Sequence, residues 1–377
     1  MPRTRQPDVV VIGGGLIGCS IALRLALAGL RVTVLERETP GAEASSAAAG
    51  MLSPQSEAIE PGPFFDLCMA SRRMYPKFAH EVEGLSGLDV DYRRDGTLLV
   101  ATNPRQRHEL GTVYQAQKRM GLSITRLSGK SVHSRVSGLA PKIDCGLFVP
   151  GDHSIDNEKL SAAVALACAR LGVDIRTGIS ATQIVVKHDR VERVRVGDES
   201  GKSGEISAGH FVLAAGCWSA ALAEPLGIKL PLKPCHGQMM EFESPRPLPL
   251  VVRAGHAYLV PRSERRIVVG TTSEYRAGFE KPITAEGLQS LMDGAIKVLP
   301  EFKQYRFLRA WAGLRPDTAD HLPILGRGGI SNLAFATGHF RNGILLAPIT
   351  AEIVTDLVLK GSTRRPIEPY RPTRFRT

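Results

Sequence analysis

The 377-residue sequence lacks the features of disulfide-rich secreted proteins, zinc proteins and low-complexity chains. Its six cysteines are widely scattered, with no C-x-x-C pair and no histidine at zinc-ligand spacing, so neither a disulfide framework nor a metal site is indicated. No internal repeat is evident, and 43% hydrophobic with 23% charged residues is typical of a folded globular protein. We therefore expect about two domains, reduced and mostly buried thiols, and a cytoplasmic location.

Long uninterrupted hydrophobic runs are also scarce. The stretch from Val9 to Leu30 follows a basic start and imitates a signal peptide, but glycines and Arg24 interrupt it and no small-residue cleavage pattern comes after it. No other segment approaches the roughly 20 apolar residues that a membrane-spanning helix needs. We therefore expect neither a cleaved leader nor a membrane span.

Acidic residues are fewer than basic ones, 37 against 48, and the formal net charge is +11. The excess is unevenly placed, because residues 1–7 and 361–377 together supply +6 of it. The rest of the chain is only mildly basic, which argues against a concentrated nucleic-acid-binding face. We interpret residues 366–377 as a basic tail outside the folded domains.

The first 36 residues have the pattern of a dinucleotide-binding unit. A β-branched run at Asp8–Ile12 predicts a buried parallel strand, and a G-x-G-x-x-G frame then leads into a helix-prone stretch. In that frame Gly13 permits a tight turn, Gly15 lets the backbone approach a pyrophosphate, and Gly18 lets the helix pack on the strand. Glu36 ends a second predicted strand, where it can accept hydrogen bonds from ribose hydroxyls.

An incidental glycine-rich turn is the alternative interpretation, but strand, turn, helix, strand and acid all occur in the required order. The segment after Glu36 bears on the choice between NAD and FAD. Residues 41–52 read G-A-E-A-S-S-A-A-A-G-M-L, a small-residue segment suited to an extended cofactor, where an NAD enzyme would continue with strand-helix repeats. This favours FAD.

Strand patterns of two kinds are interleaved further along the chain. Residues 172–175 and 210–216 are typical of parallel strands, whereas residues 233–272 alternate as antiparallel strands do. We also predict a helix over 64–83 and a hairpin over 90–101 with Asp95-Gly96 at its turn.

The expected class is α/β (α+β overall), a Rossmann-like cofactor domain interleaved with an antiparallel-sheet substrate domain. The predicted boundaries are 1–88, 150–225 and 308–365 for the first domain, and 89–149 and 226–307 for the second.

Five segments carry a family resemblance. They are V-V-V-I-G-G-G-L-I-G at 9–18, S-S-A-A-A-G-M-L at 45–52, V-L-A-A-G-C-W-S at 212–219, W-A-G-L-R-P at 311–316 and G-H-F-R-N-G-I-L-L-A-P at 338–348. Together they resemble the FAD-dependent D-amino-acid oxidase superfamily, and within it most closely the glycine oxidases of thiamine biosynthesis. The resemblance spans almost the whole chain.

The resemblance implies non-covalent FAD, because the C-terminal loop lacks the cysteine by which sarcosine oxidases attach flavin. The implied reaction is oxidation of glycine, sarcosine or a small D-amino acid by hydride transfer from Cα to flavin N5. O₂ then reoxidises the flavin, and the products are imine or glyoxylate, ammonia and H₂O₂. The implied FAD contacts, beside Gly13, Gly15 and Gly18, are Leu16, Ile17, Glu36, Arg37, Ala44, Ser45, Ala49, Gly50, Met51, Ala181, His339, Phe340, Arg341, Asn342, Gly343, Ile344 and Leu345.

The resemblance also places the substrate carboxylate on Arg315, with Tyr258, Arg341 and His256 lining the site. This agrees with general chemistry, because a planar guanidinium binds a carboxylate bidentately. The reaction needs fixed geometry more than an acid-base catalyst, and no metal. The prototype glycine oxidase has methionine where this chain has Ser273, so the choice among the small substrates stays open.

Two alternatives are kept. The tail, with Tyr370 and Phe375, suggests a membrane-associated D-amino-acid or glycine dehydrogenase that passes electrons to quinone. A nucleic-acid-associated amine oxidase is weaker, because it needs a concentrated basic face. We expect a small amino acid and O₂ as partners, enzymes of thiamine thiazole synthesis as further partners, and a homo-oligomer.

Overall fold

A computed structural model describes residues 6–57 and 60–375. Its first sheet has six strands in the order β18-β19-β12-β1-β2-β8, parallel except for the β18–β19 pair. Their bounds are β1 Val9–Ile12, β2 Val32–Leu35, β8 Asp174–Arg176, β12 His210–Leu213, β18 Ile324–Arg327 and β19 Leu333–Thr337. The sequence prediction of parallel strands at 8–12, 172–175 and 210–216 is confirmed.

Both faces of this sheet are covered, which explains why β1 is apolar throughout. Val9 and Val11 belong to the core beneath the helices, whereas Val10 and Ile12 face a second core. That second core is shared with the antiparallel sheet of β9 (Ser180–Lys187), β10 (Arg190–Gly197) and β11 (Ser203–Ile206). The helices on the first face are α1 Leu16–Leu27, α4 Pro63–Ser86, α7 Asn157–Arg170 and α10 Gly343–Lys360.

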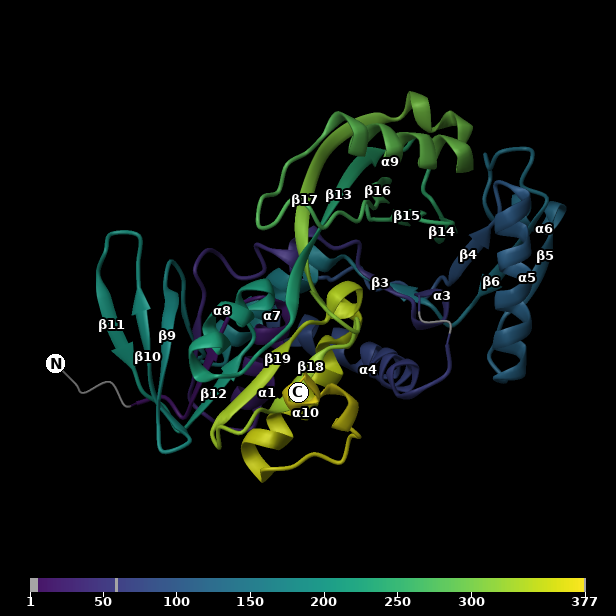
Figure 1. Cartoon of the computed structure of the whole chain (residues 1–377). Coiled ribbons are helices and arrows are strands. Elements are labelled where there is room, and N and C mark those ends of the chain that lie inside the picture. The colour runs from purple at the N-terminus through teal and green to yellow at the C-terminus, as the bar shows by residue number, and fades with distance from the viewer. Residues whose placement is uncertain (1–5, 58–59, 376–377) are drawn as a thin grey trace.

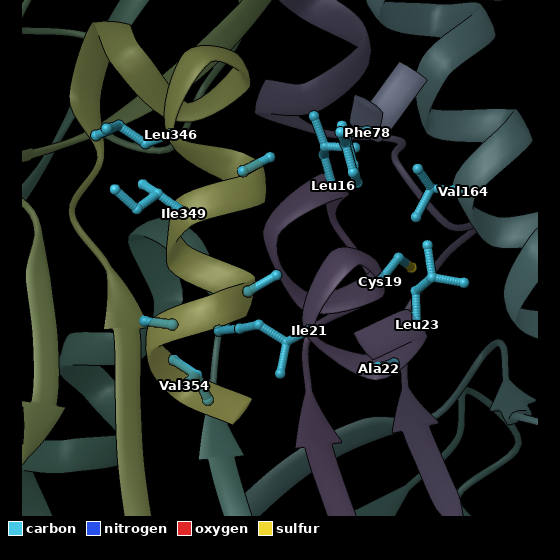
Figure 2. Packing of buried hydrophobic residues seen from close by; sticks show 14 of the residues in the cluster. Leu16, Cys19, Ile21, Ala22, Leu23, Phe78, Val164, Leu346, Ile349 and Val354 are labelled. Atoms are coloured by element: carbon cyan, nitrogen blue, oxygen red, sulfur yellow. The ribbon is translucent and has the colours of Figure 1, made fainter. Parts of the chain in front are cut away.

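Helix α1 lies at the centre of the helical layer. Figure 2 shows its side chains between α10 on one side and the residues Phe78 and Val164 on the other. Residues 340–360 are long and apolar enough to cross a membrane by length and composition, so the expectation that no such segment exists is wrong. However, 61% of the apolar window is buried inside the protein, where α10 packs on α1 and α4.

The second sheet has eight strands in the order β17-β13-β16-β15-β14-β4-β6-β5, antiparallel except for the β14–β4 pair. Figure 1 shows α9 lying over it and the long strands β13 and β17 running from it toward the parallel sheet. Their bounds are β4 Thr97–Val100, β5 Thr125–Ser128, β6 Cys145–Val149, β13 Leu232–Glu243, β14 Val251–Ala254, β15 Ala257–Pro261, β16 Arg266–Gly270 and β17 Arg306–Thr318, with α9 at Ala285–Val298.

Shorter elements complete the fold. They are α2 Ala44–Ala47, β3 Met51–Leu52, α3 Pro54–Glu57, α5 Pro104–Arg119, α6 Gly129–Arg135, β7 His153–Ser154, η1 Gly216–Trp218, α8 Ser219–Ala223, η2 Glu224–Leu226, η3 Pro300–Gln304, η4 Phe340–Asn342, η5 Glu368–Tyr370 and η6 Pro372–Phe375. The predicted helix at 64–83 is confirmed by α4.

Two sequence predictions about organisation are wrong. Residues 90–101 form no hairpin, because β4 pairs with β6 and β14 while Arg93 bridges to Ser154. The boundary at 308 is also wrong, because β17 pairs with β13 in the eight-stranded sheet from Arg306 to Thr318, with one irregularity at Leu308. The return to the cofactor domain therefore comes after Thr318.

The interpretation of residues 366–377 as a detached tail is wrong as well. Ile367 and Tyr370 are buried, with 4% and 1% of their surface exposed. Arg374 pairs with Asp320, at 2.8 Å from Nε to Oδ2, and also donates to the Leu322 carbonyl oxygen. Because its aromatic residue Tyr370 lies in the core, the tail no longer supports the membrane-associated alternative. Residues 376–377 lie outside the described part of the chain.

Candidate active site

A cavity of about 500 Å³ lies where the carboxyl ends of the parallel strands meet the face of the eight-stranded sheet. This is where open α/β sheets bind ligands, since the turns after the strands leave backbone donors free there. Residues from both domains line the cavity, including Gly13 after β1, Met239 of β13 and Arg315 of β17. The interleaving of the two domains therefore builds the site.

The glycine-rich turn has the close contacts that its sequence predicts. A Cβ on Gly18 would stand 1.9 Å from the Gly13 carbonyl oxygen, so only glycine lets α1 pack there. Gly13 has φ +108°, and a Cβ on it would stand 2.5 Å from the Ala214 carbonyl oxygen. Gly15 lies at the start of α1 and lines the cavity, with the Ser45 hydroxyl accepting a bond from the next amide, Leu16 N, at 2.9 Å.

Glu36 is held at the end of β2 by two backbone amides. Its Oε2 accepts a hydrogen bond from Gly14 N at 2.7 Å, and its Oε1 accepts one from Glu38 N at 2.9 Å. A carboxylate offers about four lone-pair positions, so each oxygen can still accept a hydroxyl. Glu36 lines the cavity and is therefore positioned for a ribose.

The loop at 339–343 closes the other side of the cavity. Helix α10 begins at Gly343, so its positive dipole end faces the cavity, where anionic character on a ligand is favoured. Burial lowers the pKa of His339 to about 3, and its Nε2 lies 3.0 Å from the Thr350 hydroxyl. His339 is thus a neutral structural residue. Phe340 has φ +46° and stacks against His321, with ring centroids 5.2 Å apart.

Arg315 is placed by the pairing of β13 with β17. Its Nη2 donates to the Thr271 hydroxyl at 2.5 Å and its Nη1 to the Thr272 carbonyl oxygen at 3.3 Å. Within residues 6–57 and 60–375, no carboxylate lies within 4.0 Å of this guanidinium. Arg341 differs, because it pairs with Glu57 at 3.1 Å. Arg315 is therefore the guanidinium in the cavity that is available for an external carboxylate.

Tyr258 lies between these groups, on β15. Its ring is 4% exposed, and burial raises the pKa of its phenol while the charges of Arg315 and Arg341 act in the opposite direction. The phenol is therefore neutral and can donate a hydrogen bond. Its partner in this structure is the Met239 sulfur, at 3.5 Å.

Most of the predicted site residues come together in this cavity, and three do not. The lining includes Gly13, Gly15, Leu16, Ile17, Glu36, Arg37, Ala44, Ser45, Ala49, Gly50, Met51, Ala181, Tyr258, Arg315, His339, Phe340, Arg341, Asn342, Gly343 and Ile344. Gly18 packs beneath the turn, and Leu345 is buried in the helical core. His256 is exposed and lines a different cavity beside α9. Ser273 is also exposed, outside the lining.

Other lining residues were not predicted. Glu57 and Thr271 make polar contacts inside the cavity, and Trp218 stacks on Arg37, with 3.7 Å from Cζ to the ring centroid. Glu57 comes after P-Q-S, which carries no motif, so no local signal marks it. Trp218 lies in the V-L-A-A-G-C-W-S segment and could have been found there.

The rest of the chemical inventory is limited. All six cysteine thiols are free and five are buried, as expected from the sequence. In the described ranges 6–57 and 60–375, no group of three or more His, Cys, Asp or Glu side chains is placed to hold a metal ion.

The dinucleotide turn and a guanidinium with no carboxylate partner in the described part of the chain line one cavity, an arrangement typical of redox enzymes that hold a nucleotide cofactor beside an anionic substrate. The family profile described as "DAO: FAD dependent oxidoreductase" matches residues 8–357, and the chain belongs to this family. FAD is the cofactor of the family. The residues of this chain are suited to hold FAD, because the glycine turn, the Glu36 carboxylate and the start of α10 all face the cavity.

Named relatives agree with this assignment. The bifunctional protein ThiO/ThiG of Trichormus variabilis is 36% identical over 98% of this chain, which spans only 55% of that relative, about half its length. The glycine oxidase of Geobacillus kaustophilus is 32% identical over 98% of both chains. Its crystal structure has a TM-score of 0.91 to this chain and covers 98% of this chain and 99% of that one. The L-proline dehydrogenase of P. horikoshii, 24% identical with a TM-score of 0.85, shares the fold.

Proposed function

We propose that this protein oxidises glycine or another small amino acid, such as sarcosine or a small D-amino acid, and uses O₂ as the final acceptor. For glycine, water and O₂ the products are glyoxylate, ammonia and H₂O₂. The observation that carries the proposal is the Arg315 guanidinium, which lines the cavity without a carboxylate partner among the described residues. The glycine oxidases among the relatives support the substrate class.

The protein's own residues supply binding and orientation. Arg315 holds the substrate carboxylate through a bidentate contact, and the neutral Tyr258 phenol donates a further hydrogen bond. Met239 and Met51 provide an apolar wall that excludes water from the reacting carbon. FAD, when bound, supplies the hydride acceptor. Because the carboxylate is fixed, the substrate Cα is held in one place relative to the cavity.

The proposal includes non-covalent FAD, held by the glycine turn, Glu36 and the loop 339–343. Acid precipitation of the yellow protein should leave the flavin in the supernatant. Flavin that stays with the pellet would overturn this part of the proposal.

The proposed cellular role rests on the relatives. Because ThiO/ThiG relatives join two activities in one chain, we propose that the imine or glyoxylate product feeds thiamine thiazole synthesis and that enzymes of that route are partners. Introducing the gene into a bacterium that lacks glycine oxidase should restore growth without added thiazole. The cytoplasmic location and the homo-oligomeric state stay predictions.

The proposed reaction is tested by oxygen consumption. The purified holoenzyme should consume O₂ and release an equal amount of H₂O₂ with at least one of glycine, sarcosine and D-alanine. Substrate oxidation that requires a quinone in place of O₂ would instead support the dehydrogenase.

A further inference from the structure

Glu57 lies between two guanidinium groups at the edge of the cavity. It is the last residue of α3, and its Oε2 accepts a hydrogen bond from Arg341 Nε at 3.1 Å. Its Oε1 accepts one from Arg253 Nη1 at 2.6 Å. The Glu57 side chain is 12% exposed, against 28% for Arg341 and 19% for Arg253. The three side chains therefore form a half-buried charged cluster in which each oxygen of the carboxylate accepts a hydrogen bond from an arginine.

The cavity thus contains two guanidinium groups in different states. Among residues 6–57 and 60–375, Arg315 contacts neutral groups of Thr271, Thr272 and Cys235, whereas Arg341 pairs with the Glu57 carboxylate. Arg315, Arg341, Glu57 and Tyr258 all line the same cavity. A substrate held at Arg315 therefore lies close to the Glu57–Arg341 pair.

We propose that Glu57 determines specificity by excluding substrates that carry a second carboxylate. This inference rests on the proposed function, in which Arg315 binds the first carboxylate. A free Arg341 would offer a second planar fork for an acid group. Glu57 already binds the Arg341 guanidinium, and its carboxylate carries the same negative charge as the second acid group of such a substrate. That acid group therefore has no free guanidinium at Arg341 and is repelled by Glu57. The substrate class is thereby restricted to monocarboxylic amino acids and their small N-alkyl derivatives.

Glu57 cannot simply be displaced, because α3 is anchored on both sides. Arg253 Nη1 also donates to the Ser56 carbonyl oxygen, at 2.6 Å. Beneath α3 the buried Asp152 carboxyl accepts from the Ser56 hydroxyl and from Gln55 N. Expelling Glu57 would leave two half-buried guanidinium groups without a counter-charge, which is costly.

The test compares sarcosine with iminodiacetate, which is sarcosine with a carboxylate on its methyl group. The ratio of kcat/KM for iminodiacetate to that for sarcosine is measured in the holoenzyme and in Glu57→Gln. Removing one repelling charge and freeing Arg341 should raise this ratio by about tenfold or more. The double variant Glu57→Gln/Arg341→Met should return the ratio to near the wild-type value. Glu301→Gln, which breaks an exposed ion pair with Arg246, is the matched control and should leave it unchanged.

The outcomes separate this inference from the proposed function. If the wild type oxidises sarcosine but the ratio in Glu57→Gln stays within about twofold of wild type, the specificity role is wrong. The specificity role is also wrong if the double variant keeps the raised kcat/KM ratio, or if Glu57→Gln lowers kcat/KM for both substrates equally. If the wild type oxidises none of the small amino acids, the proposed function itself fails.

A second measurement does not depend on the folding of a variant. Acetate and malonate differ by one carboxylate, and both can compete with the substrate at Arg315. In the wild-type holoenzyme acetate should inhibit at least about tenfold more strongly than malonate. Equal inhibition, or tighter binding of malonate, would overturn the inference.

Discussion

The guanidinium of Arg315 lies directly over the backbone of Gly237. A Cβ added to Gly237 would stand 2.3 Å from Arg315 Nη1 and 2.4 Å from Nη2. The register of β13 and β17 explains the contact, because Cys235 is opposite Arg315 and Gly237 is the next residue on the same face of β13. The missing side chain at Gly237 provides the space in which the carboxylate-binding group lies.

Gly237→Ala should therefore impair substrate binding without unfolding the protein. The atoms that the new methyl group would meet are the far end of a flexible side chain, so the guanidinium shifts and the strand stays in place. We expect KM for the preferred substrate to rise by about tenfold or more, because bidentate contact needs exact alignment of both N–H groups. Steady-state kinetics and the thermal midpoint together measure this.

The control for that substitution is Gly84→Ala in α4. No atom lies within 4 Å of a Cβ at Gly84, and alanine favours a helix. KM should be unchanged in this variant. A Gly237→Ala enzyme with wild-type KM would show that Arg315 does not hold the substrate carboxylate.

The buried Asp152 predicts an unusual pH dependence of stability. Burial raises the pKa of its carboxyl to about 7. The negative charge of Glu57 also raises this pKa, whereas the hydrogen bonds from Ser56 and Gln55 and the charge of Arg72 lower it. Folding therefore favours the protonated form. The stabilisation of the folded state by protonated Asp152 is complete below about pH 4 and is lost as the pH rises through about 7.

Asp152→Asn removes this titration while keeping the shape of the side chain. The free energy of unfolding of the variant, relative to wild type, should increase between pH 5 and pH 8. Urea unfolding at the two pH values measures it. Parallel changes in both proteins would mean that Asp152 does not titrate in this range. The pKa of the neighbouring His153 is lowered to about 4 by burial, but His153 is present in both proteins and cancels in the comparison.

The C-terminal segment should contribute to stability. Tyr370 is 1% exposed, and large-to-small substitutions at such positions cost about 3–5 kcal/mol, so Tyr370→Ala should lower the free energy of unfolding by that order. Arg364 is exposed on the same segment, and Arg364→Ala should change it by less than about 0.5 kcal/mol. Denaturant midpoints compare the two. Equal midpoints would support the detached tail that the charge pattern suggested.

The dinucleotide unit was predictable because its requirements are local. Gly13 and Gly18 are fixed by contacts within one turn, and the strand, helix and acid occur in order along the chain. Arg315 was found through its motif, but its freedom from carboxylates depends on tertiary contacts. Glu57 was missed because its partners Arg253 and Arg341 lie about 200 and 280 residues away in the sequence.

His256 shows where sequence adjacency misleads. It is two residues from Tyr258, which suggests the same face of a strand. The pairing of Ala254 with Ala257 instead places Gly255 and His256 in the two-residue turn between β14 and β15. The alternation begins only at Ala257, so His256 lies outside the cavity that Tyr258 lines. The interpretation of residues 366–377 as a tail was wrong for a similar reason, because charge alone does not reveal the contact of Arg374 with Asp320.

Anaerobic reduction of the flavin tests the central claim most directly. Purified holoenzyme and Arg315→Lys are mixed without oxygen with glycine, sarcosine or D-alanine, and the loss of flavin absorbance is monitored. The wild type should bleach with at least one of them, and Arg315→Lys should need about a hundredfold more substrate, because an ammonium cannot form the bidentate contact. A wild-type flavin that stays oxidised with every small amino acid, or an Arg315→Lys enzyme that bleaches at wild-type concentrations, would contradict the proposed role of Arg315 in amino-acid oxidation.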